Sequence, residues 1–473
     1  MILRHRKAIW TGVIAFALVS ASCLDKDAIF DVLPLFEDPP PAAKGFLGYG
    51  NPAEKVTLCG NCHIGQQSEW KQTAHAGAWT TLQESGHAAE YCEQCHTVGA
   101  NGNVVVDTDV GWTATQNERY QDVQCESCHG PGLEHITNPD ATQPLAPLTV
   151  GVDLTAGCGE CHSGAHQPFV EEWGQSRHGT MNSYPQGRAE CVQCHEARGI
   201  FNSWGITSEY LEKNQTEPIP ITCGVCHDPH DRTNPKQLRF PIDEPNEDTN
   251  LCMKCHHKRG VPEANSSRGP HSPQGPLLLG TAGWRPPNFT FQDDTIISTH
   301  GSAANPRMCA TCHVTGLEIT DQETGAFVFN STGHLFRAIP CLDAQGIPVP
   351  TGTCAIAERN FGACATSGCH GTPASAQSAF SVTRNRLDVL VARLNGQLGQ
   401  IPLSEFNSFD NTITTAEGAR FNSELGAMSG STAHNPLLVE ALLVASINQI
   451  ELDYGIVPGP APSGADPNTP EFR

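Results

Sequence analysis

Eight short segments of the chain share the pattern Cys-x-x-Cys-His, from CGNCH at residue 59 to CATCH at residue 309. Two thiols at this spacing can form thioether bonds with one edge of a rigid porphyrin, and the imidazole that follows can bind its iron. The segments therefore predict eight covalently attached c-type haems. The predicted attachment residues are Cys59, Cys62, Cys92, Cys95, Cys125, Cys128, Cys158, Cys161, Cys191, Cys194, Cys223, Cys226, Cys252, Cys255, Cys309 and Cys312, and the predicted proximal ligands are His63, His96, His129, His162, His195, His227, His256 and His313.

Two other interpretations of paired cysteines are less consistent with this pattern. A zinc ribbon uses Cys-x-x-Cys pairs, but zinc has no need for a histidine after each pair. A redox-active dithiol lies in a thioredoxin-like unit, and nothing around these pairs resembles one. We therefore interpret all eight segments as haem attachment sites.

A ninth segment, ACATSGCHG at residues 363–371, has four residues between its cysteines instead of two. It is either a stretched haem site, with Cys364 and Cys369 attached and His370 proximal, or a disulfide loop that ends in Cys-His. Gly368 would allow the two extra residues to bulge outward, because glycine tolerates unusual backbone angles. With this site included, we predict about nine haems.

Internal repeats favour the haem interpretation of the ninth segment. The first five motifs begin 33 residues apart, and three matching segments around them recur at offsets of 99, 99 and 98 residues, which indicates a duplicated three-haem unit. A looser third copy follows, in which CATCHVTG at residue 309 resembles CEQCHTVG at residue 92. In this copy the slot for the third haem holds CATSGCHG.

The sixth ligands of the irons are predicted from the remaining histidines. Of the 21 histidines, nine are proximal candidates and one precedes the mature chain, so enough remain to ligate every iron on its second side. Some of the remaining histidines occupy equivalent positions in the repeated three-haem units. His434 instead stands at the start of a predicted C-terminal helix. The predicted distal ligands are His75, His178, His300, His135, His230, His434, His271, His166 and His334. Because few methionines are present, we expect mostly bis-histidine haems of low potential.

The N-terminus predicts export. Arg4, Arg6 and Lys7 precede an apolar stretch over residues 8–19 that is too short to span a bilayer comfortably. We predict a signal peptide at residues 1–22 and lipidation of Cys23, with ordinary signal cleavage as the alternative. The predicted location is the periplasm, or the outer membrane or cell surface as a lipoprotein.

Two cysteines, Cys341 and Cys354, belong to no haem motif. An exported protein can keep disulfides, so we predict that these two form one.

The composition predicts an interior that is not filled by side chains alone. Only 38% of the residues are apolar, and 45 Gly and 35 Pro leave little room for regular structure. Haems would then supply much of the core, and folding would depend on their attachment. The net charge of −22 excludes nucleic acid as a partner. An acidic surface is also repelled by anionic membranes, so we expect membrane contact only through the predicted lipid at Cys23.

The expected fold is mainly α-helical with little regular secondary structure, organised around a chain of haems and followed by a C-terminal helical segment. We expect a hairpin in ITDQETGAFVF, and helices through Leu387–Leu398, 415–428 and 436–453, the last capped by Asn435 and Pro436. The predicted divisions are a signal peptide at 1–22, a tether at 23–50, three-haem units at 51–150, 151–245 and 246–375, the helical segment at 376–457 and a disordered tail at 458–473.

These motifs resemble the exported multihaem c-type cytochromes. The segments CHGPGLEH and CHDPH are similar to those of the tetrahaem cytochromes of ammonia oxidisers and the decahaem cytochromes of outer-membrane conduits. The C-terminus with its HNP is similar to octahaem and pentahaem enzymes such as hydroxylamine oxidoreductase, tetrathionate reductase and nitrite reductase.

The resemblance implies haem-to-haem electron transfer between redox partner proteins in the cell envelope. One alternative is an oxidoreductase that acts on a small nitrogen or sulfur oxyanion at one open haem, for which the CATSGCH site is the first candidate. The chain lacks the Cys-x-x-Cys-Lys motif of nitrite reductases, which weighs against this enzyme. Another alternative is a subunit of an extracellular cytochrome filament.

Overall fold

The computed structural model describes residues 37–151, 156–164, 167–206, 209–287, 289, 296–321, 323–349, 354–366, 368 and 370–460. Residues from Pro40 onward group into one unit and residues 1–39 into another. The predicted signal peptide, the predicted lipidation site Cys23, the candidate ligand His166, Cys369 and most of the predicted tail lie outside the described residues.

Most of the regular structure in the described residues is helical, and most of the helices are short. The helices up to the ninth motif are α2 (Ile64–Trp70), α3 (Ala78–Glu84), α4 (Glu90–His96), α5 (Gly111–Thr115), α6 (Cys125–His129), α7 (Leu133–Thr137), α8 (Phe169–Gln175), α9 (Ala189–His195), α10 (Ala197–Trp204), α11 (Cys223–Cys226), α12 (Gln274–Leu279), α13 (Cys309–His313) and α14 (Gly362–Thr366). The prediction of a mainly helical fold with little regular structure is confirmed. Among the described helices, none is long and apolar enough to cross a bilayer.

The described strands form small antiparallel pairs. β1 (Tyr49–Asn51) pairs with β2 (Val56–Thr57), β3 (Glu318–Thr320) with β4 (Phe327–Asn330), and β5 (Cys341–Leu342) with β6 (Pro348–Val349). The β3–β4 pair is the hairpin predicted from ITDQETGAFVF.

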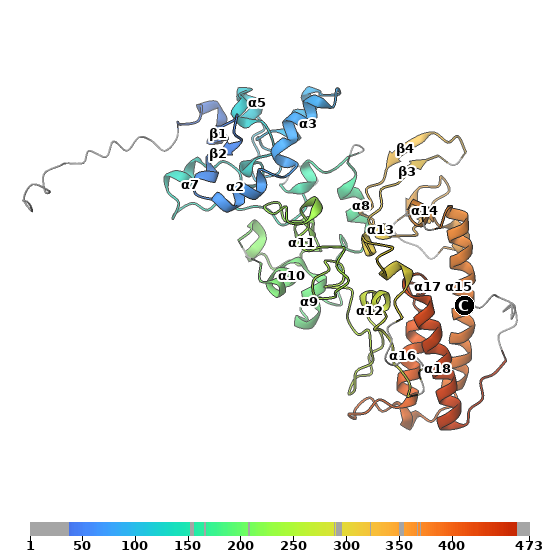
Figure 1. The fold of residues 1–473 in the computed structure, drawn as a ribbon. Helices are drawn as coiled ribbons and strands as arrows, with labels where there is room; N and C mark the ends of the chain where they lie inside the picture. The colour runs from blue at the N-terminus through green and yellow to red at the C-terminus, as the bar shows by residue number, and fades with distance from the viewer. Residues whose placement is uncertain are drawn as a thin grey trace, which may run out of the picture. The chain divides into compact units, whose positions relative to one another are not determined.

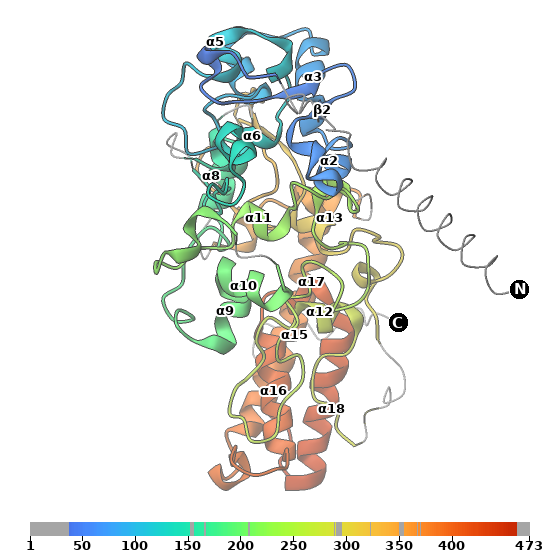
Figure 2. The same cartoon turned by 90° about the vertical axis from the view of Figure 1, so that its left-hand side faces the viewer.

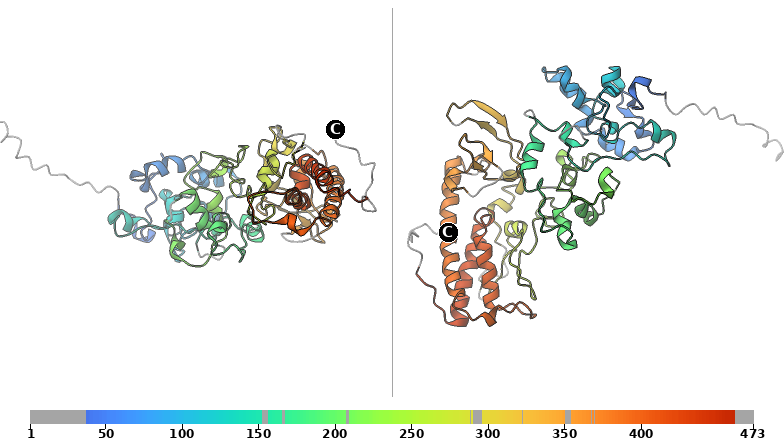
Figure 3. Two further views of the ribbon diagram at one scale, coloured as in Figure 1. Left: turned by 90° about the horizontal axis from the view of Figure 1, so that it is seen from below. Right: turned by 180° about the vertical axis from the view of Figure 1, so that it is seen from behind.

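Three longer helices pack side by side at the C-terminal end of the chain: α15 (Pro373–Leu398), α16 (Thr415–Ala427) and α18 (Pro436–Tyr454), as Figures 1, 2 and 3 show. Their starts are fixed by capping side chains. Thr372 accepts a hydrogen bond from the Ser375 N–H, Thr414 and Glu417 form a capping box, and Asn435 accepts from the Leu438 N–H. The cap and first turn predicted at Asn435 and Pro436 are confirmed.

The largest apolar core lies among these helices. Leu387 and Leu394 of α15, Leu425 of α16, and Leu438 and Leu443 of α18 are at most 1% exposed and belong to one cluster. Smaller clusters occur beneath the haem motifs. Among the described residues, the largest side-chain core therefore lies in the C-terminal segment, and the smaller ones lie among the haem motifs.

The predicted tether is too long at its C-terminal end. Phe46 and Leu47 are fully buried, and Phe46 packs in one cluster with Val98 and Trp112. The Pro-rich composition suggested an extended linker, but the apolar residues after Pro41 bury against the first unit instead, which favours an ordered chain. The folded part of the described chain thus begins near Pro40, eleven residues earlier than predicted.

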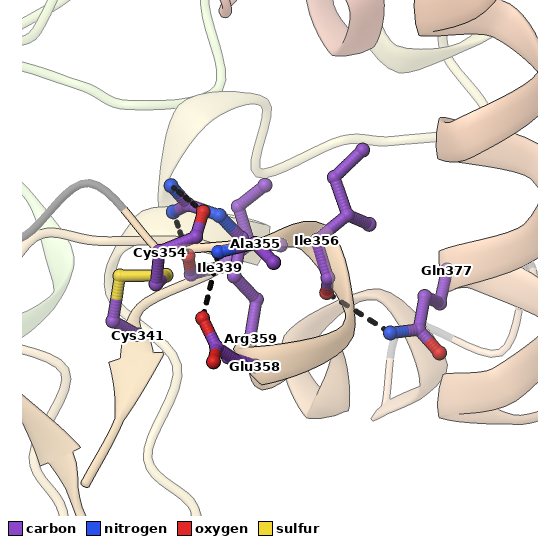
Figure 4. Close-up of a disulfide and its surroundings, with 8 residues drawn as sticks. All are labelled: Ile339, Cys341, Cys354, Ala355, Ile356, Glu358, Arg359 and Gln377. Carbon is purple, nitrogen blue, oxygen red and sulfur yellow. Dashed lines mark hydrogen bonds between the residues drawn. A yellow bond between two sulfur atoms is a disulfide. The ribbon is translucent and has the colours of Figure 1, made fainter.

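A disulfide joins Cys341 of β5 to Cys354, with the Cα atoms 6.0 Å apart (Figure 4). The Arg359 guanidinium donates to the Ile339 carbonyl at 3.1 Å beside it. The Gln377 side-chain amide of α15 donates to the Ile356 carbonyl at 2.9 Å. These contacts connect the disulfide loop to the helical segment.

Candidate haem-binding sites

The Cys-x-x-Cys-His motifs fold as single helical turns. Those at residues 92, 125, 191, 223 and 309 lie on α4, α6, α9, α11 and α13, and those at 59 and 158 begin 3-10 turns. The histidine N–H donates to the carbonyl of the first cysteine, as in His63 to Cys59 at 3.0 Å and His227 to Cys223 at 2.9 Å. Because residues i, i+3 and i+4 share one helix face, both thiols and the imidazole face the same space.

Most of these faces open on one continuous cavity of about 3870 Å³, lined by thiols and imidazoles of motifs from residue 92 to residue 370. Pockets for small ligands usually have volumes of about 300–1,000 Å³. This cavity therefore has room for several large cofactors, and the motif residues line it as covalent attachment would require.

The proximal and distal candidates meet in pairs, most of them across this cavity. An imidazole nitrogen binds a metal at about 2 Å and the ring centre lies about 1 Å behind it, so two imidazoles on opposite sides of one metal have ring centres about 6 Å apart. Eight pairs in the structure have centres 5.9–6.5 Å apart, and each joins one proximal and one distal candidate. The pairs are His63 with His135, His162 with His75, His129 with His230, His256 with His178, His195 with His271, His227 with His334, His370 with His300, and His313 with His434.

The elements that carry the distal candidates are short. His135 lies on α7, His434 ends α17 (Ser431–His434), and His75 and His300 lie on 3-10 turns. The remaining proximal candidate, His96, ends α4, and the only distal candidate not in these pairs, His166, lies outside the described residues.

Hydrogen bonds orient many of these rings, which sequence analysis did not foresee. The Nδ1 atoms of His96, His135 and His313 face the carbonyls of Ala78, Thr142 and Phe336 at 2.8, 2.6 and 3.0 Å. A carbonyl only accepts, so Nδ1 carries the proton in each ring. The other nitrogen, Nε2, is then the unprotonated one and is available to a metal.

Burial keeps several of the paired imidazoles neutral. It lowers the pKa of His75, His129, His178 and His334 to about 4, and the paired or neighbouring imidazole lowers the pKa further. Burial likewise lowers the pKa of His434 to about 3. Since only neutral imidazole binds a metal, these sites are ready for an iron at any physiological pH.

Among the described residues, no three His, Cys, Asp or Glu side chains gather around one point as zinc ligands do. Each of the eight paired sites instead contains two facing imidazoles, and motif cysteines lie beside the proximal one. This set fits a covalently attached haem with one axial ligand on each face.

Two family models match the chain. The family described as cytochrome c554 and c-prime matches residues 58–130, and the doubled CXXCH motif matches residues 218–260. Both matches fall on haem motifs, the first within the first predicted unit and the second across the boundary between the second and third units. The chain is a multihaem c-type cytochrome.

A solved structure, the crystal structure of the outer cell wall cytochrome OcwA, also resembles this cytochrome. The two are 18% identical with a TM-score of 0.48, and the match covers 78% of each chain. No curated protein matches the cytochrome.

A buried carboxylate connects the third motif to the N-terminal segment of the cytochrome. Glu126, between the two cysteines of α6, accepts hydrogen bonds from the N–H groups of Leu47, Gly48 and Gly132 at 2.7–2.9 Å. Burial raises the pKa of Glu126 to about 7, although the three N–H groups oppose this. Both of its oxygens act as acceptors.

Glu126→Gln is therefore expected to loosen the segment around Leu47. A glutamine has one acceptor oxygen, so at least one buried N–H would face an amide N–H, which costs about 1–3 kcal/mol. We expect backbone amide exchange at Leu47 and Gly48 to accelerate about tenfold or more, measured by hydrogen–deuterium exchange. The matched control is Glu134→Gln on α7, whose side chain is exposed, and equal exchange in both variants would contradict the proposed contact.

Proposed function

We propose that this cytochrome carries electrons between redox partners in the cell envelope through nine haems, each with two histidine ligands. The observation that carries the proposal is the set of eight imidazole pairs with ring centres about 6 Å apart. In this proposal the cysteines of the nine motifs hold the haems and the nine predicted proximal histidines bind the irons from one side.

The distal ligands in this proposal are the eight paired histidines and, for the His96 site, His166. When bound, a c-type haem supplies a one-electron iron couple whose potential is set by its axial ligands and surroundings. Burial holds several of the paired rings neutral, and hydrogen bonds to carbonyls fix the Nδ1–H tautomer of other ligand candidates. With haem bound, the paired histidines would each supply a nitrogen ligand to the iron, and such ligation favours a low potential.

Bis-histidine ligation favours a carrier over an enzyme. An enzyme that acts on an oxyanion needs one iron with a free position, and the first candidate from the sequence was the CATSGCH site. His370 of that site has His300 opposite it, with ring centres 6.1 Å apart. No described site offers a specific observation in favour of catalysis.

Export is part of the proposal. The predicted signal peptide would direct export, and the predicted lipidation at Cys23 would anchor the protein to a membrane. The Cys341–Cys354 disulfide is consistent with an oxidising compartment. We propose a periplasmic or outer-membrane-anchored lipoprotein with acidic surfaces that meets other redox proteins.

Electron paramagnetic resonance of the fully oxidised protein tests the proposed function, with spins quantified against total haem. We expect every haem to be low-spin, because two imidazoles give a strong ligand field. If about one haem in nine is high-spin, and its signal shifts on addition of nitrite, hydroxylamine or tetrathionate, the protein is an enzyme and the carrier proposal is wrong.

A further inference from the structure

We propose that the haem sites form a branched path, not a linear one, so that electrons can enter or leave at four places. This inference rests on the proposed function and adds the order of the sites in space. Each site is named by its proximal histidine. The main path runs through the His63, His129, His162, His227, His256, His313 and His370 sites, and the His96 and His195 sites are side branches.

Contacts between thiols of different motifs give the first links of the main path. The Cys59 thiol lies beside the Cys125 thiol, the Cys158 thiol beside the Cys223 thiol, and the Cys252 thiol beside the Cys309 thiol. In each pair the first cysteine of one motif meets the first cysteine of another. The first and last of these neighbours are also joined by nearby side chains: the Thr57 hydroxyl lies 3.7 Å from the Cys125 sulfur, and the Asn250 amide donates to the Met308 sulfur at 3.8 Å. Because these thiols mark the attached edge of each cofactor, sites whose thiols touch hold neighbouring haems.

Two further thiol contacts produce the branches. The Cys95 thiol lies beside the Cys161 thiol, and the Cys194 thiol beside the Cys255 thiol. Here the second cysteines meet. His195 also pairs with His271, which follows the motif at residue 252 in the chain. The His96 site therefore attaches to the His162 site, and the His195 site to the His256 site.

Backbone contacts fix the first of these branches. The Cys95 thiol also donates to the Glu160 carbonyl at 3.9 Å, and the Gly102 N–H donates to the Glu160 carboxylate. The motif at residue 92 is thus bound directly to the motif at residue 158, in the following unit.

The remaining links join these pairs into one path. Cys128 lies close enough to Cys158 to interact electrostatically, which connects the His129 and His162 sites. Cys226 interacts in the same way with Cys252 and Cys255, which connects the His227 and His256 sites.

The last link of the path joins the His313 and His370 sites. The His300 imidazole, which pairs with His370, donates through Nδ1 to the Ala433 carbonyl at 2.5 Å. Ala433 precedes His434, which pairs with His313. The two ligand pairs are therefore adjacent in space.

Both side branches end near the surface. Glu90 and Gln94, beside the motif at residue 92, are exposed and do not line the cavity. Arg188 and Ala189, beside the motif at residue 191, are likewise exposed and outside the cavity lining. A haem at either branch can therefore meet a partner without blocking the main path, so the cytochrome can serve more than one donor or acceptor at a time.

The repeat explains why there are two branches. In each of the first two units the middle site attaches to the first site of the next unit, and the first and third sites of one unit attach to each other. In the third unit, the motif at 309 contacts the first motif, at 252, as the third motif does in the other two units. It does so although its sequence resembles the middle motif at 92. The third unit therefore has no middle branch.

The test is to locate the irons in an experimental structure of the haem-loaded protein, by anomalous scattering in crystals or by cryo-electron microscopy. We expect the iron at His96 to have the iron at His162 as its nearest neighbour, and the iron at His195 to have that at His256. An iron at His96 that lies as near to those at His63 or His129 would overturn the branching. Missing haems or single-histidine ligation would instead contradict the proposed function.

Removal of single haems provides a second measurement that needs no structure. In C191S/C194S, which lacks a side haem, we expect the resonance of one remaining haem to change, because one neighbour is lost. In the matched variant C223S/C226S, which lacks a main-path haem, we expect two to change. Two changed neighbours in C191S/C194S would place the His195 site within the main path and contradict the proposal.

Discussion

His434→Ala is expected to convert one low-spin haem in nine into a high-spin haem. His434 faces His313 with ring centres 6.2 Å apart, and the helix that follows positions it. The Asn435 side-chain amide donates to the carbonyls of Leu277 and Ile296 at 2.9 and 2.6 Å, so the start of α18 is held in place. An alanine cannot reach the iron, and the five-coordinate iron that remains has a weaker ligand field. Electron paramagnetic resonance of the oxidised variant measures the change.

Two further variants separate loss of the ligand from general damage. His434→Met keeps a sixth ligand, so we expect the haem to stay low-spin, with a higher potential and a thioether-to-iron charge-transfer band. Free imidazole added to His434→Ala should restore the low-spin signal. Leu437→Ala, at an exposed residue on the first turn of α18 that does not line the cavity, is the matched control and should leave every haem low-spin. A His434→Ala variant in which all haems remain low-spin would show that another residue ligates this iron.

The sequence was enough to single out the thiols and imidazoles that the structure brings together, because their spacing is local. The spacing of Cys59, Cys62 and His63 alone defines one helical turn with three groups on one face. The repeats then marked His75, His178 and His300 as equivalent, and each has a proximal histidine opposite it in the structure. Equivalent positions in internal repeats are therefore enough to identify candidate ligands of this kind.

The partner of each distal histidine could not be predicted from the sequence. His75 pairs with His162 of the next unit and not with a histidine of its own unit, and His178 pairs with His256 in the same way. Such pairs depend on how units pack, which local spacing does not encode. The tether was misjudged for a similar reason, since the burial of Phe46 depends on Val98 and Trp112, which lie far along the chain.

The mature protein is expected to carry nine haems and not eight, and loss of the ninth from C364S/C369S should lower its intact mass by one haem. Cys364 lies on α14, His370 faces His300 with ring centres 6.1 Å apart, and Gly368 has a φ of +78°, a conformation that favours glycine. Gly368 thus has the backbone conformation that a bulge of the two extra residues would require. Mass spectrometry of the unfolded protein counts haems directly, because thioether bonds survive unfolding.

The competing interpretation, a disulfide between Cys364 and Cys369, predicts different masses. It gives eight haems in the wild-type protein, unchanged in C364S/C369S, and two thiols that alkylate after reduction. The matched control is C341S/C354S, which removes the disulfide next to this site and should keep all nine haems. Gly368→Val tests the bulge itself, since a β-branched residue resists positive φ, and we expect partial loss of the ninth haem. Full haem loading in Gly368→Val would mean that attachment at this stretched site does not depend on the glycine conformation.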